Sequence, residues 1–261
     1  MAQGFLTAQV RGHVTEVTMR NAAKHNSFSA AMSTELVDTL REALAAGSRA
    51  VILRAERGVK VWSAGHDISE LPDGDQDPLA WTNTLAAMME DVAAFPLPLI
   101  AAVEGGVWGG ACELVMAADI VVAHEASTFA ITPAKLGVAY SSAGISRFLA
   151  ALPVHIAKEM FFTAEPISAQ RAYDFGVVNH LVADADELEL RCWQLADVIS
   201  QRAPLTIRSA KAEIQAMTLP GESVNESAQL RSLRDSAWTS EDYREGVRAF
   251  KERRAPVFGG K

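Results

Sequence analysis

"VEGGVWGGACELVMAAD", residues 103–119, joins an apolar strand to a helix through a turn that contains four glycines. Glycine permits tight turns and close backbone approach, and the run from Ala111 to Ala118 favours a helix. Gly110 is therefore predicted at a helix N-terminus. Its N–H is unpaired within the helix and lies at the positive end of the dipole, so it can stabilise a negative oxygen. A glycine that serves only the strand-to-helix turn is the alternative.

A second turn of small residues lies upstream, in "WSAGHDISEL", residues 62–71. A short apolar strand around Val59 and Val61 ends there, and His66 follows the turn. The backbone N–H groups of His66 and Gly110, on converging turns, would form an oxyanion hole. The His66 ring as a general base is less favoured, because no serine or cysteine nucleophile motif accompanies it. A purely structural histidine is a third interpretation.

Strands and helices alternate around these two turns. Apolar runs predict strands at 50–55, 98–103 and 119–124, after a hairpin at 8–19, and helical spacing predicts helices at 29–44, 78–94, 110–118 and 143–151. This order predicts an α/β core. Four more helices are predicted at 186–202, 204–217, 222–237 and 240–253. We therefore expect a core with the site at 1–195 and a helical C-terminal region at 196–261.

Composition restricts the class of protein. The chain has 261 residues and a formal net charge of −8, which disfavours nucleic acid and anionic membranes as partners. Cys112 and Cys192 give neither a disulfide framework nor metal-ligand spacing. The N-terminus lacks a secretory pattern, and no apolar run is long enough to span a membrane. A cytoplasmic protein without a metal is expected.

"STFAITPAKLGVAY", residues 127–140, offers hydroxyl groups at Thr132 and Tyr140 but no carboxylate. With this segment and the two turns, the chain resembles the crotonase (enoyl-CoA hydratase/isomerase) superfamily. "SAGHDISEL" and "GGVWGGACELVMAADIVVA" resemble its oxyanion loops, and "TFAITPAKLGV", "PISAQRAYDFGVVNHLV" and "FKERRAPVF" resemble later segments. The resemblance implies a spiral of ββα units, acyl-CoA thioester substrates without a further cofactor, and homotrimers or hexamers held by the C-terminal helices.

The same resemblance assigns binding roles. The N–H groups of His66 and Gly110 would bind the thioester oxygen. The segment that lines the CoA arm would comprise Ala64, Gly65, His66, Asp67 and Ile68. Lys24 would lie near the CoA nucleotide, and Arg253 would reach the CoA phosphates from a neighbouring subunit. Solvated surface charges are the alternative for both cations.

Hydratases of this superfamily use two glutamates, and Glu113 matches the first. At the second position this chain has Thr132-Pro133. Hydration needs a water activated and a proton delivered, so one glutamate argues against an efficient hydratase. Decarboxylation of a malonyl-type thioester needs an oxyanion hole but no base, because departing CO₂ leaves its electron pair behind.

Within the superfamily the motifs most resemble the decarboxylases of methylmalonyl-CoA, which give propionyl-CoA. That resemblance assigns Tyr140 to the substrate carboxylate and Thr132 to substrate contact. From the chemistry, an apolar wall of Trp108, Ile131 and Val138 would favour departure of the charge as neutral CO₂. Whether Glu113 is catalytic or a structural hydrogen-bond partner stays open. For Tyr140, the alternative is a buried tyrosine that donates a hydrogen bond to a backbone carbonyl. The alternative functions are an enoyl-CoA isomerase or weak hydratase that uses Glu113, and a non-catalytic acyl-CoA-binding protein.

Overall fold

The structure is a computed structural model and describes residues 4–71, 84–218 and 227–261. It contains a six-stranded sheet in the order β1-β2-β3-β5-β7-β10. Its strands are β1 (Leu6–Arg11), β2 (Val14–Met19), β3 (Ala50–Ala55), β5 (Leu99–Val103), β7 (Ile120–His124) and β10 (His180–Val182). The first two form the predicted antiparallel hairpin, and the other neighbours pair in parallel. The predicted strand at 50–55 is buried at every residue, as expected for a strand covered on both faces.

A second sheet has the order β4-β6-β8-β9, with β4 (Val61–Ser63), β6 (Gly106–Trp108), β8 (Thr128–Ala130) and β9 (Ile167–Ser168). Consecutive strands alternate between the sheets: β3, β5 and β7 lie in the large sheet, and β4, β6 and β8 follow them in the small one. A helix comes after each pair, namely α2 (Thr84–Ala93), α3 (Gly110–Ala117) and α4 (Ser142–Ala151). These repeats are the predicted ββα units.

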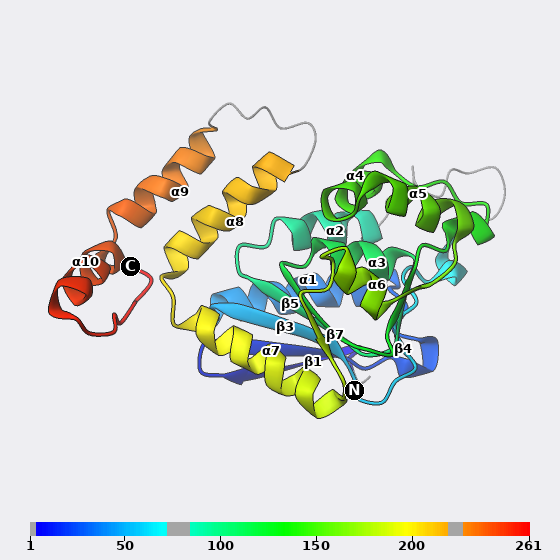
Figure 1. Cartoon of the computed structure of the whole chain (residues 1–261), viewed down its shortest axis with the longest axis horizontal. Coiled ribbons are helices and arrows are strands. Elements are labelled where there is room, and N and C mark those ends of the chain that lie inside the picture. The colour runs from blue at the N-terminus through cyan, green and yellow to red at the C-terminus, as the bar shows by residue number, and fades with distance from the viewer. Residues whose placement is uncertain (1–3, 72–83, 219–226) are drawn as a thin grey trace.

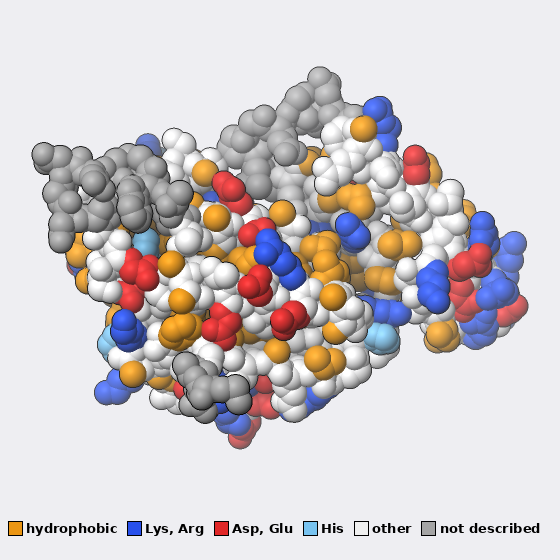
Figure 2. All heavy atoms as spheres, turned by 180° about the vertical axis from the view of Figure 1, so that it is seen from behind, with side chains coloured by type: hydrophobic (Ala, Val, Ile, Leu, Met, Phe, Trp, Pro, Cys, Tyr) orange, Lys and Arg blue, Asp and Glu red, His pale blue; other side chains and the backbone are white. Residues whose placement is uncertain are grey.

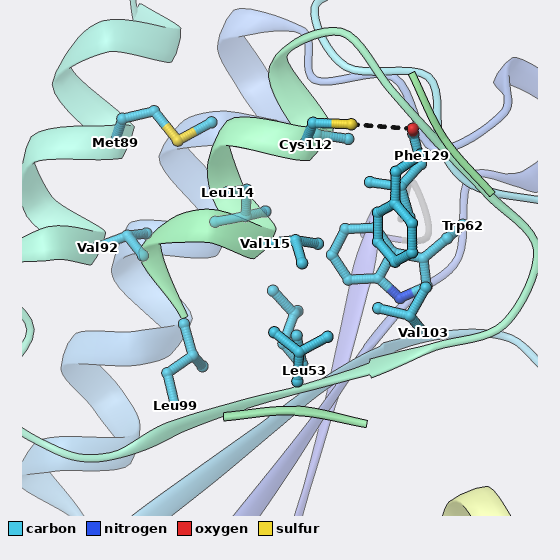
Figure 3. Close-up of a cluster of buried hydrophobic side chains, with 14 of the residues drawn as sticks. Leu53, Trp62, Met89, Val92, Leu99, Val103, Cys112, Leu114, Val115 and Phe129 are labelled. Atoms are coloured by element: carbon cyan, nitrogen blue, oxygen red, sulfur yellow. Dashed lines mark hydrogen bonds between the residues drawn. The ribbon is translucent and has the colours of Figure 1, made fainter. Parts of the chain in front are cut away.

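The main core lies between the large sheet and the helices that include α1 (Ala30–Ala45), α2 and α3. Figure 3 shows Leu114 and Val115 of α3 among Leu53, Val103 and other apolar side chains. The opposite face of the sheet packs against α7 (Ala185–Ser200) through Leu188, Cys192 and Ala196 (Figure 1). The central helix α3 is thus fixed by a packed interior, which fixes the turn at its N-terminus.

The predicted C-terminal helices are present as α7, α8 (Pro204–Thr218), α9 (Ala228–Trp238) and α10 (Glu241–Glu252). Figure 1 shows α9 and α10 standing away from the core, with α8 leading to them. The predicted boundary at residues 195/196 falls inside α7, and the division into two parts stays a prediction. Parts of two predicted helices, 78–83 and 222–226, lie outside the described residues.

Sequence patterns did not reveal several short elements. These are β8, β9, β10, α5 (Val154–Thr163) and α6 (Ala169–Asp174), with the 3-10 helices η1 (Ala22–Lys24), η2 (Ile68–Glu70) and η3 (Pro133–Lys135). Most of them have only two or three strand residues or one helical turn, which gives too few positions for a periodic pattern. Across the described ranges, no helix is both long and apolar enough to cross a membrane.

Candidate active site

A cavity of about 140 Å³ lies where the two predicted turns meet. Its walls come from the segment after β4, from α2, from the N-terminus of α3 and from the chain between β8 and α4. The lining includes Ala64, His66, Ile68, Leu71, Leu85, Met89, Gly109, Gly110, Glu113, Thr132, Leu136, Val138, Tyr140 and Arg147. Segments that are far apart in the sequence therefore build one pocket.

The N–H groups of His66 and Gly110 lie side by side. Gly65 has φ +81, and a Cβ on it would come within 2.5 Å of the Gly110 nitrogen. A Cβ on Gly110 would lie 3.6 Å from the His66 nitrogen. Only glycine suits such a left-handed conformation with a backbone in contact. Two adjacent backbone donors at the pocket wall match the geometry of an oxyanion hole.

Hydrogen bonds on both sides of His66 hold its loop. Phe28 N–H donates to Gly65 O at 2.7 Å, and Asp67 N–H donates to Phe28 O at 3.0 Å. The Asp67 carboxylate caps η2 by accepting from the Ser69 N–H at 3.1 Å. These bonds fix the backbone direction at His66, so its N–H is aimed before any ligand arrives.

The His66 ring is partly buried, and burial lowers its pKa, while Glu70 and Asp67 act in the opposite direction. A lowered pKa keeps the ring neutral at neutral pH. A neutral ring places no positive charge beside the pocket.

On the other turn, Gly109 has φ +54 and caps α3, and its N–H donates to Ala130 O at 2.8 Å. A Cβ on Gly109 would lie 3.1 Å from the Thr132 hydroxyl oxygen. Thr132 thus lies with its hydroxyl group against the turn that carries Gly110. Pro133 opens η3, and no carboxylate occupies either position.

Glu113 lies one turn into α3 and accepts two hydrogen bonds from the chain that follows β8. The Tyr140 hydroxyl donates to Oε2 at 2.7 Å, and the Arg147 guanidinium donates to Oε1 at 2.5 Å. Burial raises the pKa of Tyr140 far above its usual range, and the neighbouring Glu113 carboxylate adds to the rise. Tyr140 is therefore a neutral hydrogen-bond donor, and its partner is a carboxylate and not a backbone carbonyl.

Aromatic rings hold the Tyr140 side chain in place. Its ring meets Phe148 and Phe161 edge to face, with centroids at 5.8 and 5.3 Å. Gly144 lies on the remaining side, where a Cβ would come within 2.4 Å of Tyr140 Cε1 and 3.0 Å of Glu113 Oε2. The absence of a side chain at Gly144 makes room for the hydrogen-bonded pair.

Comparison with known proteins agrees with this geometry. The model of the family described as "Enoyl-CoA hydratase/isomerase" matches residues 9–261. The chain belongs to the enoyl-CoA hydratase/isomerase family. It is 39% identical to the methylmalonyl-CoA decarboxylase of Escherichia coli (strain K12) over 100% of both chains. Solved structures of methylmalonyl-CoA decarboxylase with 2-nitronate-propionyl-CoA and with 2S-carboxypropyl-CoA are similar at TM-score 0.81 and 38% identity, covering 100% of both chains.

The pocket brings together most of the predicted site residues. Seven of the predicted site residues line it directly: Ala64, His66, Ile68, Gly110, Glu113, Thr132 and Tyr140. Gly65 does not line the pocket, but its lack of a side chain lets its loop pack against the Gly110 nitrogen. Asp67 faces Lys24 instead, with Oδ2 and Nζ 3.5 Å apart. Arg253 caps the C-terminus of α10, in the helical arm formed by α8, α9 and α10, and is not among the residues that line the pocket.

The predicted apolar wall was wrong at two of its three residues. Val138 lines the pocket, but Ile131 is buried in the core and Trp108 is not part of the lining. Strand β8 ends one residue before Ile131, and its side chain points into the interior. Leu85 and Met89 of α2, with Leu136, supply apolar surface instead. The sequence "LPDGDQDP", residues 71–78, predicts an acidic loop at the pocket edge, but all of it except Leu71 lies outside the described residues, as does Trp81.

Arg147 and Gly144 are the site residues that sequence reasoning missed. Both lie on α4, three residues apart and hence on one helix face. A charge within a helical pattern reads as a solvated residue, and an internal glycine has no distinct signal. In the described ranges, no cluster of three or more His, Cys, Asp or Glu residues is arranged to hold a metal ion.

Proposed function

We propose that the protein decarboxylates methylmalonyl-CoA, or a closely related malonyl-type thioester, to propionyl-CoA. The observation that carries this proposal is that the proposed oxyanion hole has no free buried carboxylate beside it in the described lining. Position 133 has no acid, Glu113 is held by two donors, and Glu90, the other carboxylate in the described lining, is exposed at the rim. The described part of the lining therefore offers backbone donors for an enolate oxygen but no free buried carboxylate that could act as a base.

The reaction balances without a base or an oxidant. The bond between the α-carbon and the carboxylate breaks, CO₂ leaves, and the electron pair moves through the α-carbon to the thioester oxygen. The N–H groups of His66 and Gly110 would receive that oxygen, and each such donor is worth roughly 3–4 kcal/mol. A proton then reaches the α-carbon, and propionyl-CoA results.

The leaving carboxylate would lie beside Thr132, whose neutral hydroxyl group can donate to it, and near Tyr140, whose single hydroxyl proton is donated to Glu113. Neutral groups orient a carboxylate without neutralising its charge, whereas a cation would stabilise the ground state and slow the loss of CO₂. Leu85, Met89 and Val138 line the pocket with apolar side chains, which would surround the methyl side of the acyl group. An apolar surrounding disfavours a charged carboxylate relative to neutral CO₂, so it favours the loss of CO₂.

Substrate binding extends beyond the cavity. Ala64–Ile68 would line the CoA arm, with Lys24 near the nucleotide, since Lys24 lies beside Asp67 on the same rim. We propose Arg253 as a phosphate contact supplied by a neighbouring subunit, because its place on α10 keeps it away from its own pocket. No cofactor beyond the CoA of the substrate is proposed.

A homotrimer or hexamer is proposed on the basis of the helical arm. Trp238, Tyr243 and Phe250 are exposed on α9 and α10, and a groove with Met116, Ile120, Ile207 and Ile214 opens between the core and α8. Figure 2 shows apolar side chains gathered where the core meets the arm. An association that covers these surfaces would remove large apolar side chains from water. A cytoplasmic location is proposed from the two buried free cysteines.

The function is tested by a substrate screen. Malonyl-, methylmalonyl-, ethylmalonyl- and crotonyl-CoA are each incubated with the protein without metal, biotin or nucleotide, and the products are identified by mass spectrometry. Propionyl-CoA from methylmalonyl-CoA is expected. Hydrated crotonyl-CoA would favour the hydratase or isomerase alternative, and binding without any product would favour a non-catalytic acyl-CoA-binding protein.

A further inference from the structure

Arg147 lies at the wall of the acyl pocket, although the proposed chemistry assigns it no role. Its side chain is 13% exposed and comes from α4, opposite Glu113 on α3. We propose that Arg147 is a positioning residue for the decarboxylation, acting through Glu113 to fix the Tyr140 hydroxyl at the acyl pocket. This inference rests on the proposed function and adds a residue to that site.

The first support is the division of the Glu113 carboxylate between two donors. Oε1 accepts from Arg147 at 2.5 Å and Oε2 accepts from Tyr140 at 2.7 Å. A carboxylate with only one partner can rotate about its terminal torsion, whereas two donors on different oxygens fix its plane. Arg147 therefore sets the direction in which Oε2 points, and with it the position of the Tyr140 hydroxyl.

The second support is charge. Glu113 has a side chain 9% exposed, so an unpaired carboxylate there would be costly. Paired with Arg147, Glu113 is an acceptor whose oxygens are both occupied. The guanidinium charge is compensated in turn, so it does not stabilise the substrate carboxylate that must leave. The pair thus keeps a free base and a free cation out of the pocket.

The third support is the shape of α4. Gly144 and Arg147 lie on the same helix face, and the space left by Gly144 receives the Tyr140 ring. Phe148 of the same helix contacts that ring edge to face. The helix α4 therefore provides the space for the Tyr140 ring and an aromatic contact to it. Through Arg147 it also orients Glu113, the hydrogen-bond acceptor of Tyr140.

The test is a double-mutant cycle on decarboxylation. Steady-state kinetics with methylmalonyl-CoA compare wild type, Arg147→Gln, Glu113→Gln and the double variant. Arg147→Gln is expected to lower kcat by about 10- to 100-fold, as misplacement of a site group by an ångström does. KM should change less than about threefold, because the CoA contacts are untouched. If Arg147 acts through Glu113, the double variant should be no slower than Glu113→Gln.

Two controls keep the test sharp. Arg171→Gln removes an exposed Arg–Glu pair with Glu159 and should leave kcat unchanged. Calorimetric binding of 2-carboxypropyl-CoA, which keeps a carboxylate and CoA but lacks the thioester carbonyl that would receive the electron pair, should be near wild type in Arg147→Gln and so shows an intact pocket. If Arg147→Gln does not fold, Arg147→Lys replaces it throughout the cycle, since it keeps the charge but not the guanidinium geometry.

The outcomes separate the two proposals. Wild-type protein without turnover overturns the proposed function, and the positioning role falls with it. Active wild type with an unchanged kcat in the Arg147 variant overturns the inference alone. Additive losses in the double variant, or a loss confined to KM, also overturn it, because both indicate that Arg147 acts independently of Glu113.

Discussion

Tyr140 and Glu113 are joined by a hydrogen bond of 2.7 Å, although 27 residues separate them in the chain. The bond connects α3, whose first residue is the proposed oxyanion donor Gly110, to the segment where Thr132-Pro133 stands in place of an acid. It makes Tyr140 the donor and Glu113 the acceptor. The two halves of the pocket are therefore coupled by a neutral hydroxyl and an occupied carboxylate.

Removing that hydroxyl should impair chemistry more than binding. Tyr140→Phe is expected to lower kcat by roughly 10- to 100-fold, because Glu113 loses a hydrogen-bond partner and the pocket wall near the substrate carboxylate loses a fixed polar group. KM should stay within about threefold of wild type. Steady-state kinetics check this, with Tyr173→Phe on the exposed face of α6 as the matched control. Equal losses in kcat and in analogue affinity would mark Tyr140 as structural only.

A methyl group on Gly110 should block the oxyanion hole. Its Cβ would lie 3.6 Å from the His66 nitrogen and 2.9 Å from Leu85 Cδ2. Gly110→Ala should lower kcat by roughly 10²–10³-fold, the usual loss when one donor is removed. Gly246→Ala is the control, since that Cβ would meet Phe258 at an ordinary 3.7 Å. Near wild-type turnover in Gly110→Ala would mean that the thioester oxygen binds elsewhere.

Gly144→Ala should displace Tyr140 without removing any polar group. Alanine is favoured over glycine in a helix by about 1 kcal/mol, but the added Cβ would come within 2.4 Å of the Tyr140 ring. We expect kcat to fall by about tenfold or more while the helix is retained by circular dichroism. Unchanged kinetics would show that Tyr140 need not occupy this position.

Stability should decline as the pH falls below about 6.5, the ordinary pKa of histidine. Burial lowers the pKa of His66. Burial, and to a lesser extent the positive charge of Arg191, lower the pKa of His180. The unfolded chain then binds protons that the folded protein does not, so stability is complete above pH 6.5 and is lost below it. One group contributes at most about 1.4 kcal/mol per pH unit.

Urea unfolding at pH 7.5 and 5.5 measures this effect. His66→Gln should show a smaller loss between the two pH values than wild type, with His180 as the remaining contributor. His66→Gln keeps the backbone N–H, so its decarboxylation should also persist. Identical pH dependence in both proteins would exclude His66 as a source of the effect.

A buried ion pair should anchor α8 to the core and so contribute to the free energy of unfolding. Lys211 of α8 donates to Asp119 at 2.7 Å and to Leu97 O at 2.9 Å, and its side chain is 7% exposed. Lys211→Met should reduce the free energy of unfolding by about 2 kcal/mol, less than for a fully buried pair because Asp119 is partly exposed. Lys135→Met, from the exposed pair with Glu165, should cost less than about 0.5 kcal/mol. Equal costs would contradict an anchoring role.

The sequence carries the local part of this site. Glycines before an apolar helix predict the turn at Gly110, and the run at 50–55 predicts a buried strand; the structure confirms both positions. The absence of an acid at Thr132-Pro133 is likewise visible in the sequence. These features depend on neighbouring residues, so short patterns reveal them.

Long-range packing was not predictable. The contact between Arg147 and Glu113 spans 34 residues and depends on the angle between α3 and α4. The direction of Ile131, which points into the core, depends on where β8 ends. A sequence pattern predicts which face of a helix or strand is apolar, but not which other element packs against that face.

Release of CO₂ from methylmalonyl-CoA carboxyl-labelled with ¹³C, followed by mass spectrometry without added metal, biotin or nucleotide, tests the central claim most directly. Labelled CO₂ should appear in equal amount to propionyl-CoA, nearly vanish in Gly110→Ala, and be accompanied by no hydration of crotonyl-CoA in a parallel sample. No labelled CO₂ from either epimer, together with hydration of crotonyl-CoA that Glu113→Gln abolishes, would contradict it.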